Sequence, residues 1–366
     1  MQKIDLTGKC ILVTGAAGFI GAGLVLRLIR EGQAARVVGV DNLNDYYDPA
    51  IKHWRLSQIE AAAKDARDTS WSFVEGDIAD ADLIRSLFAS EKPDITVHLA
   101  AQAGVRYSIT NPDAYIQSNL VGFYNILEAC RHSYDDISAD HQGIQHLVYA
   151  SSSSVYGTNR KVPFSTEDKV DDPVSLYAAT KKSNELMAHA YSKLYNIPST
   201  GLRFFTVYGP AGRPDMAYFG FTDKLRDGKT IRIFNYGNCS RDFTYIDDIV
   251  EGVLRVMQGA PERRIGEDDL PIPPCAIYNI GGGRPTSLLD FVSILQEELL
   301  RAGILPKDYD FAAHKELVAM QPGDVPVTYA DTSALEQDYG YRPQTTLREG
   351  LRSFAEWYRD FYRDRL

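Results

Sequence analysis

Short runs of apolar and β-branched residues alternate with longer helical patterns through the first half of the chain. The runs predict strands at residues 10–13, 36–40, 71–74, 95–99, 146–150 and 199–204. The clearest helical patterns cover residues 19–30, 114–129 and 177–195. Continuously apolar strands need a sheet that is covered on both faces. Their alternation with helices predicts an α/β fold built on a doubly wound parallel (Rossmann) sheet.

The second half of the chain is less regular, because proline and glycine interrupt the pattern beyond about residue 210. A charged, proline-rich stretch at 261–274 is expected to be an exposed loop. We therefore expect a Rossmann domain over residues 1–180 and a second, smaller mixed α/β domain over residues 181–366. Some segments of the second half are expected to return to the Rossmann core.

A glycine-rich turn directly follows the first predicted strand, where Gly15, Gly18 and Gly21 have the spacing Gly-x-x-Gly-x-x-Gly. Gly15 permits the tight turn, Gly18 lets a pyrophosphate approach the amides of the helix N-terminus, and Gly21 lets the helix pack closely. Asp41 stands at the end of the second predicted strand, where a carboxylate accepts from both ribose hydroxyls. Since a carboxylate there repels a 2′-phosphate, the pattern predicts NAD rather than NADP.

Two further strand ends are expected to border the same cofactor. Asp77 can accept from an adenine amine, although an acid at this position is also typical of a helix N-cap. Lys52 and Arg55 lie nearby in the sequence and are expected on a solvated helix face. The expected cofactor contacts are Gly15, Gly18, Phe19, Ile20, Gly21, Asp41, Asn42, Asp77, Ile78, Ala100, Ala101, Tyr177 and Lys181.

Tyr177 and Lys181 have the spacing that places two side chains on one face of a helix. A phenol titrates near pH ~10, so it needs a neighbouring positive charge to act as a base at neutral pH. The ammonium of Lys181, together with a positive nicotinamide, would lower the pKa of Tyr177. The serine run 151–154 ends another predicted strand and offers a hydroxyl to the same substrate oxygen.

Together, these motifs resemble the extended short-chain dehydrogenase/reductases that act on nucleotide sugars. Within that group the sequence is most similar to the UDP-glucuronate 4-epimerases. The similarity is carried by Tyr177-x-x-x-Lys181, Val155-Tyr156-Gly157 and the segments 41–48, 100–108, 206–210, 213–216, 237–243 and 321–326. By this match the catalytic hydroxyl falls on Ser152. Ala211 departs from the pattern, since close relatives usually have a large aromatic residue there.

The resemblance implies NAD-dependent epimerisation at C4 of UDP-glucuronate, giving UDP-galacturonate through a transient 4-keto sugar that turns over in the site. The first domain would bind NAD and the second the UDP-sugar. Ser152 and Tyr177 would hold the sugar O4, and Lys181 would bind the nicotinamide ribose. The remaining expected substrate contacts are Ser153, Ser154, Thr206 and Arg213 (the last two on the C6 carboxylate), Arg241 (on the diphosphate) and Asp324.

Several alternatives share this scaffold. A UDP-glucuronate decarboxylase, or a 4-epimerase of neutral UDP-hexoses or UDP-N-acetylhexosamines, would use the same first steps. A sugar 4,6-dehydratase would need two carboxylates where Ser153 and Ser154 stand, which argues against it. From a different class, a non-catalytic NAD-binding protein could use the same fold, but the intact Ser152, Tyr177 and Lys181 weigh against it.

Composition narrows the partners and the location. The chain has 366 residues with a net charge of −10, from 39 Lys and Arg against 49 Asp and Glu. Such a chain is a poor nucleic-acid binder, and no stretch approaches the ~20 apolar residues of a membrane span. Four scattered cysteines without zinc spacing predict reduced thiols in a cytoplasmic protein.

Two expectations concern assembly and metals. By resemblance we expect a homodimer that pairs through the helices at 114–129 and 177–195. His132 and His141 lie among several acids in the stretch 131–145, and His146 directly follows this stretch. We expect a solvated surface loop there, and no metal site. Within the acidic background, Lys181, Arg213 and Arg241 are expected to make the site locally positive.

Overall fold

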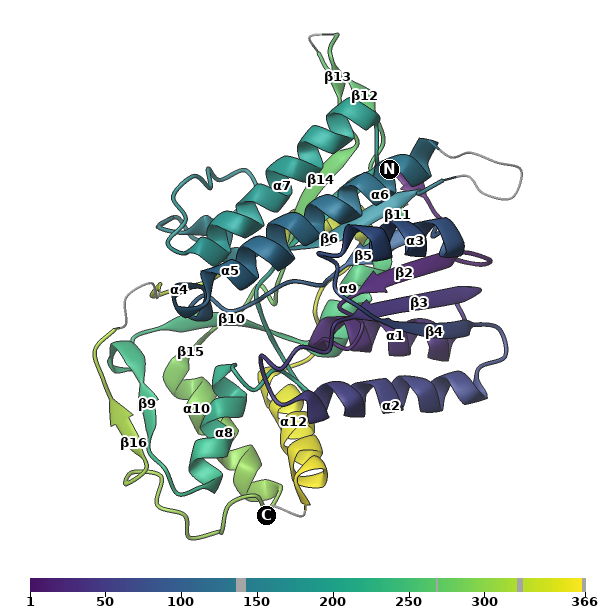
Figure 1. The fold of residues 1–366 in the computed structure, drawn as a ribbon. Coiled ribbons are helices and arrows are strands. Elements are labelled where there is room, and N and C mark those ends of the chain that lie inside the picture. Colours follow the sequence, from purple (N-terminus) through teal and green to yellow (C-terminus); the bar gives the residue numbers. More distant parts are fainter. Residues whose placement is uncertain (136–142, 268, 321–324, 364–366) are drawn as a thin grey trace.

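A parallel sheet of seven strands forms the centre of the fold (Figure 1). The computed structural model of the chain describes residues 1–135, 143–267, 269–320 and 325–363. Across the sheet the order is β14-β7-β6-β5-β2-β3-β4, and all neighbouring pairs are parallel. The strands are β2 Cys10–Thr14, β3 Arg36–Asp41, β4 Ser70–Glu75, β5 Ile95–His98, β6 His146–Ser152, β7 Ser199–Phe204 and β14 Cys275–Ile280. The doubly wound sheet predicted from the sequence is confirmed.

Helices cover both faces of this sheet (Figure 1). Successive residues of a strand face opposite sides, so Ile11 and Val13 pack with α1, α2 and α9, whereas Leu12 packs with α3, α6 and α7. The order of connection reverses between β2 and β5, and such a point in an open α/β sheet is where ligands bind. The flanking helices are α1 Phe19–Glu31, α2 Pro49–Asp65, α3 Ala81–Glu91, α6 Gly122–Asp135, α7 Leu176–Tyr195 and α9 Ile246–Met257.

The helix predicted at 114–129 is not uniform. Two short helices, α4 Tyr107–Thr110 and α5 Pro112–Tyr115, lead into a π-helical segment, η1 Ile116–Val121, which then continues as α6. Its Asn119 side chain accepts from the amide of Gln102 and donates to the Gln102 carbonyl and to Thr180 Oγ1, at 2.8, 3.0 and 3.1 Å. The π segment thus ties α7 to the strand end after β5.

A second lobe lies beyond the carboxyl edge of the sheet (Figure 1). Its core is rich in aromatic side chains, which include Tyr218, Phe219, Phe291, Phe354 and Tyr358. It contains β8 Thr206–Tyr208, α8 Ala217–Arg226, β9 Ile231–Ile233, η3 Phe234–Gly237, β10 Ser240–Tyr245, β15 Pro285–Ser287, α10 Leu288–Arg301, β16 Lys315–Leu317 and α12 Leu347–Phe361. Strands β15, β10 and β8 form a small mixed sheet, and β16 pairs with β9.

The remaining elements correct one expectation. They are β1 Gln2–Lys3, η2 Ser153–Tyr156, β11 Gly259–Ala260, β12 Arg264–Ile265, β13 Pro271–Ile272 and α11 Ser333–Tyr339. The stretch 261–274, expected as a loop, contains the antiparallel pair β12–β13, which projects from the molecule (Figure 1). The central sheet also takes β7 and β14 from beyond residue 180. The assignment of one domain to NAD and the other to the sugar stays a prediction.

The histidines near residues 131–145 do not form one group. His132 is exposed on α6, His141 lies outside the described residues, and His146 is fully buried in β6. The Nε2 of His146 is 2.8 Å from Thr200 Oγ1, and burial lowers the pKa of His146 to about 4. The expected solvated loop is therefore wrong for His146. In the described ranges no three His, Cys, Asp or Glu side chains are grouped to hold a metal, and none of the helices there is long and apolar enough to cross a membrane.

Candidate active site

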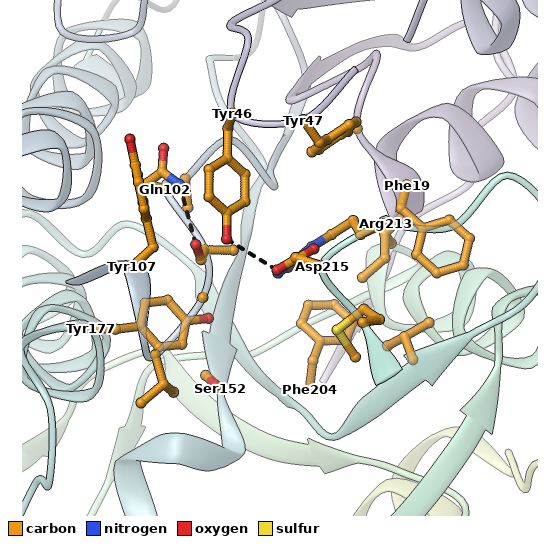
Figure 2. A pocket seen from close by; sticks show the side chains of 18 of the residues that line it. Phe19, Tyr46, Tyr47, Gln102, Tyr107, Ser152, Tyr177, Phe204, Arg213 and Asp215 are labelled. Carbon is orange, nitrogen blue, oxygen red and sulfur yellow. Dashed lines mark hydrogen bonds and ion pairs between the residues drawn. The ribbon is translucent and has the colours of Figure 1, made fainter. Parts of the chain in front are cut away.

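A cavity of about 1050 Å³ lies at the carboxyl ends of the parallel strands and extends to the second lobe (Figure 2). It brings together nearly all of the site residues predicted from the sequence. Those that line it are Gly15, Gly18, Phe19, Ile20, Gly21, Asp41, Asn42, Asp77, Ile78, Ala100, Ala101, Ser152, Ser153, Tyr177, Lys181, Thr206, Arg213 and Arg241. Ser154 does not line the cavity, and Asp324 lies outside the described residues.

The glycine turn has the geometry of an anion cradle. Gly15 has a φ of 71°, and a Cβ there would lie 2.8 Å from the amide nitrogen of Ala100. A Cβ on Gly18 would lie 2.9 Å from the carbonyl oxygen of Gly15, and one on Gly21 would overlap the same oxygen. Gly21 is therefore needed for packing of α1 on the turn itself. Along the described chain no side chain caps α1 at Gly18, so the first amides of the helix face the cavity and fit a dinucleotide pyrophosphate.

Asp41 is held beside this turn. Its Oδ2 accepts from the amide of Ala17 at 3.2 Å, and its Oδ1 accepts from the amide of Leu43 at 2.9 Å. Each oxygen keeps a further lone pair, so the carboxylate fits the ribose hydroxyls of NAD. The ammonium of Lys52 is 3.8 Å from Oδ1 and donates to Asn44.

The expectation that Lys52 and Arg55 lie on a solvated face is wrong. They are only 4% and 3% exposed. Burial lowers the pKa of Lys52, while Asp41 opposes this shift. The helical pattern of α2 did not show this, because the second lobe covers the start of the helix and its residues are far away in the sequence.

Asp77 is not the N-cap of α3, which was the alternative role considered for it. The N-cap of α3 is Asp80, whose carboxylate accepts from the amides of Asp82 and Leu83. Asp77 instead accepts from the amide of Ala79 and from the Asn42 side chain, at 2.8 and 2.9 Å. This pair joins two strand ends across the cavity wall and leaves lone pairs for a ligand.

Ser152 and Tyr177 approach each other from β6 and α7 (Figure 2). The Oγ of Ser152 accepts from the amide and the hydroxyl of Ser154, at 3.2 and 2.9 Å. Ser154, predicted to bind substrate, therefore supports Ser152 from outside the cavity. Burial raises the pKa of Tyr177, with the Ser152 hydroxyl and then the charge of Arg213 acting against that rise.

Lys181 lies one turn after Tyr177 but is bound elsewhere. Its Nζ donates to the carbonyl of Ala150 at 2.9 Å, and burial lowers its pKa to about 8. Lys181 was expected to lower the pKa of Tyr177, yet the net shift of that pKa is upward. The positive charge that opposes the shift comes from Arg213, on a loop of the second lobe.

Arg213 is paired with an acid that the sequence analysis did not assign. Its Nε and Nη2 donate to the two oxygens of Asp215 at 2.9 and 2.5 Å, and the Tyr46 hydroxyl donates to Asp215 at 3.1 Å (Figure 2). Burial acts to raise the pKa of Asp215, but the charge and bonds of Arg213 outweigh it and lower that pKa. The two-residue spacing of Arg213 and Asp215 was the available signal. Within the described chain the Nη1 of Arg213 has no hydrogen-bond partner.

Arg241 meets the cavity from β10. Its Nη1 donates to the carbonyls of Ser240 and Pro326, at 3.0 and 3.2 Å. The neighbouring Asp242 is turned away and fully buried, because its carboxylate accepts from three backbone amides, those of Gly282, Gly283 and Ala330. No acid of the described residues pairs with Arg241, which leaves its charge available for an anion.

The cavity differs in charge from the chain as a whole. Among the described residues, six basic side chains line it against three acidic ones. The basic residues are Lys52, Arg106, Lys181, Arg213, Lys224 and Arg241. The local positive excess expected from the sequence is therefore present within a chain of net charge −10.

Comparisons with known proteins agree with this geometry. Residues 11–281 match the model of the NAD dependent epimerase/dehydratase family. The chain belongs to this family. It is 46% identical to UDP-glucuronate 4-epimerase 4 of Arabidopsis thaliana over 361 residues, covering 97% of this chain and 76% of the relative. It is 47% identical to Protein CapI of Staphylococcus aureus over 359 residues, covering 96% and 99%.

A solved structure is also similar. The UDP-glucuronic acid 4-epimerase from Bacillus cereus, in complex with UDP-glucuronic acid and NAD, superposes with a TM-score of 0.79 at 32% identity. The match covers 96% of this chain and 100% of that one. NAD is thus the cofactor of this epimerase/dehydratase family member, in agreement with the glycine turn and Asp41.

Behind the site, this family member has a buried ion pair that fixes α7. Arg203 on β7 donates to both oxygens of Glu185 on α7, at 2.8 and 2.9 Å. Ser151 donates to the same carboxylate at 2.6 Å, and Arg203 also donates to the Tyr156 hydroxyl at 3.0 Å. The network joins β6, β7 and α7, so it holds the helix that carries Tyr177 in place.

Proposed function

We propose that the chain is an NAD-dependent UDP-glucuronate 4-epimerase that converts UDP-glucuronate into UDP-galacturonate. One observation carries this proposal: a single cavity contains the glycine turn, the group Ser152, Tyr177 and Lys181, and the cations Arg213 and Arg241. Relatives named UDP-glucuronate 4-epimerase, and a neighbour solved with UDP-glucuronic acid and NAD, support the choice of substrate.

The cofactor would be held by the turn and by Asp41. The chemistry that NAD supplies when bound is reversible hydride transfer at C4 of the sugar. Tyr177 removes the proton from the O4 hydroxyl and later returns it, and the Ser152 hydroxyl holds the same oxygen. Burial raises the pKa of Tyr177 and favours the neutral phenol, which returns the proton to O4 in the second half of the reaction. Positive charge from Arg213, and from a bound nicotinamide, favours the phenolate when the proton moves.

The substrate would be held by its two anionic ends. Arg241, which forms no ion pair with an acid of the described residues, offers its guanidinium to the diphosphate. Asp215 occupies the Nε–Nη2 edge of Arg213, so the Nη1–Nη2 edge remains for the C6 carboxylate, and Thr206 lines the cavity nearby. Control of this carboxylate matters, because a 4-keto uronic acid is a β-keto acid and readily loses CO2.

Inversion at C4 also requires the sugar to rotate within the site. The keto sugar must rotate about its link to the diphosphate, so that both faces of C4 meet the same residues. The cavity of about 1050 Å³ is slightly larger than the range of ~300–1,000 Å³ found for small-molecule pockets. This volume is shared between the dinucleotide site and the sugar site, since residues of both line the cavity.

The test is to incubate the protein with NAD and UDP-glucuronate and to identify the product by NMR. Formation of UDP-galacturonate supports the proposal. UDP-xylose would identify a decarboxylase, and turnover of neutral UDP-hexoses alone would identify a neutral-sugar epimerase. If neither turnover nor NADH formation occurs with any UDP-sugar, the chain is a non-catalytic NAD-binding protein.

We further propose a homodimer in the cytoplasm. Helices α6 and α7 lie side by side on the outside of the sheet (Figure 1). They carry exposed apolar side chains at Tyr124, Leu186 and Leu194, and such a surface is typical of an interface. The four free thiols support a reducing compartment.

A further inference from the structure

Arg55 forms a buried junction between two segments that are far apart in the sequence. Its Nη1 donates to the carbonyl of Ala17 and to the Tyr47 hydroxyl, both at 2.8 Å. Its Nε and Nη2 donate to the carbonyl of Ala211 at 2.9 and 2.6 Å, and Nη2 also donates to Gly212 at 3.1 Å. All five N–H groups of the guanidinium are thereby used.

The two segments are the glycine turn and the loop that presents Arg213. Ala17 lies between Gly15 and Gly18 in the turn, and Ala211 and Gly212 directly precede Arg213. Arg55 itself is not among the residues that line the cavity. It therefore acts on the two binding loops through their backbone carbonyls.

The buried charge of Arg55 is not balanced by an acid. All of its acceptors are neutral, and no described acid lies within ion-pair distance of it. Burial of a cation without a counter-ion is costly unless its hydrogen bonds are satisfied. The planar fork gives a definite geometry in return, because its donors reach several carbonyls in one plane.

The loop that Arg55 holds is strained. Ala211 is buried and has a φ of 52°, a left-handed conformation that non-glycine residues rarely adopt. Such a conformation persists only where surrounding contacts impose it. Two of the five bonds from Arg55 end on the carbonyl of this residue.

We propose that Arg55 is a positioning residue that locks the Arg213 loop against the glycine turn, and so fixes the sugar carboxylate relative to the bound dinucleotide. This inference rests on the proposed function. With the lock removed, Arg213 would still be present, but its position relative to C4 of the sugar would vary. Both turnover and control of the carboxylate would then suffer.

The test compares Arg55→Met and Arg55→Lys with wild type as NAD-loaded enzymes. Arg85→Met serves as the matched control, since Arg85 is an exposed arginine on α3. We expect kcat/KM for UDP-glucuronate to fall about 10- to 100-fold in Arg55→Met, as for other small misplacements of a binding group. Bound NAD and the inhibition constant of UDP should stay within about twofold of wild type, because Arg241 is unchanged and the Ala17 amide of the turn still donates to Asp41.

The products give a second readout that a purely structural role would not move. If the carboxylate is poorly held, the C5–C6 bond of the 4-keto intermediate breaks, CO2 leaves and a proton takes its place at C5. The two electrons taken from C4 then remain as NADH, one per decarboxylated sugar. We expect this leak, measured by NADH absorbance and NMR, to rise in Arg55→Met, with Arg55→Lys between it and wild type.

Wild-type kcat/KM and product partition in Arg55→Met, with normal bound NAD, would overturn the inference. If Arg55→Met does not fold, Arg55→Lys decides by the same criteria. Loss of folded protein in both variants assigns Arg55 to stability alone and also overturns it. Failure of the proposed function is separate, because it is decided by the products of the wild-type enzyme.

Discussion

Two cations near the reacting centre are held in opposite ways. Lys181 is 3% exposed and donates to a carbonyl, with burial as the cause of its lowered pKa. Arg213 is forked onto Asp215 and keeps its charge. The positive charge of Lys181 is therefore held at a cost in stability, whereas that of Arg213 is balanced by an acid that also occupies one of its edges.

The cost at Lys181 can be measured through its pH dependence. Its pKa in the folded chain is about 8, against an ordinary value of 10.5. Between these values the unfolded chain binds more protons than the folded one, so the free energy of unfolding rises with pH. We expect Lys181→Met to be more stable than wild type at pH 7 by roughly 2 kcal/mol. This value is about 3 kcal/mol for the pKa shift less about 1 kcal/mol for the lost hydrogen bond.

Denaturant unfolding of both proteins at several pH values checks this prediction. The stability difference should shrink as the pH rises from 8 to 10.5. Lys193→Met, an exposed position on the same helix, should show no gain at pH 7. A Lys181→Met variant no more stable than wild type at pH 7 would contradict it.

Removal of Arg213 should separate binding from stability. In Arg213→Ala we expect kcat/KM for UDP-glucuronate to fall about 10- to 100-fold, the value of a charged hydrogen bond, with unchanged NAD affinity. The half-buried Asp215 is left without its cation, which should cost about 1–2 kcal/mol of unfolding free energy. Arg213→Ala combined with Asp215→Asn should recover stability but not activity. Unaltered turnover in Arg213→Ala would remove Arg213 from the substrate site.

At the scale of elements, the turn between β2 and α1 depends on contacts that a single methyl group would break. A Cβ on Gly21 would overlap the carbonyl oxygen of Gly15, so the backbone must move. A Cβ on Gly23, in the same helix, would lie 3.0 Å from Cγ2 of Val250, at the tip of a side chain that can shift. The two glycines therefore form a matched pair.

We expect Gly21→Ala to weaken NAD binding at least about tenfold and to cost about 1–3 kcal/mol of stability, as overpacking does. Gly23→Ala should bind NAD as wild type does, because the gain in helix propensity of about 1 kcal/mol offsets the strain at Val250. Calorimetric titration with NAD and thermal unfolding of both variants provide the measurements. Equal NAD affinity in the two variants would show that the turn tolerates displacement.

Short sequence patterns predicted the elements that depend mainly on contacts between residues close together in the sequence. Apolar runs predicted six strands, glycine spacing predicted the start of α1, and helical periodicity predicted the helix of Tyr177. The seventh strand, β14, was missed because it follows a proline-rich stretch and becomes a strand only by pairing with β7. The buried state of Arg55 and the pairing of Asp215 with Tyr46 likewise depend on chain segments that meet only in the folded protein. Ser154 was assigned to substrate because sequence spacing cannot show which hydroxyl of a serine run turns inward.

At the scale of the whole molecule, the charge of the cavity differs in sign from the net charge of the chain. The chain carries a net charge of −10, while basic residues outnumber acidic ones in the cavity. The cavity thus attracts a trianionic sugar nucleotide although the net charge of the chain opposes it, and this attraction should strengthen at low ionic strength. Exposed apolar side chains are spread over several elements and include Tyr124 on α6 and Leu186 and Leu194 on α7.

The outer face of α7 should pair with a second copy of the chain. Leu186 and Leu194 are 59% and 70% exposed, whereas the inner face of the same helix carries Tyr177 and Lys181. We expect wild type to be a dimer at micromolar concentration, and Leu186→Glu combined with Leu194→Glu to be a monomer, because two buried carboxylates per subunit would oppose association. Ile265→Glu, on the exposed β12–β13 hairpin, should remain dimeric. Size-exclusion chromatography with light scattering distinguishes the monomer from the dimer. A monomeric wild type would contradict the proposed homodimer.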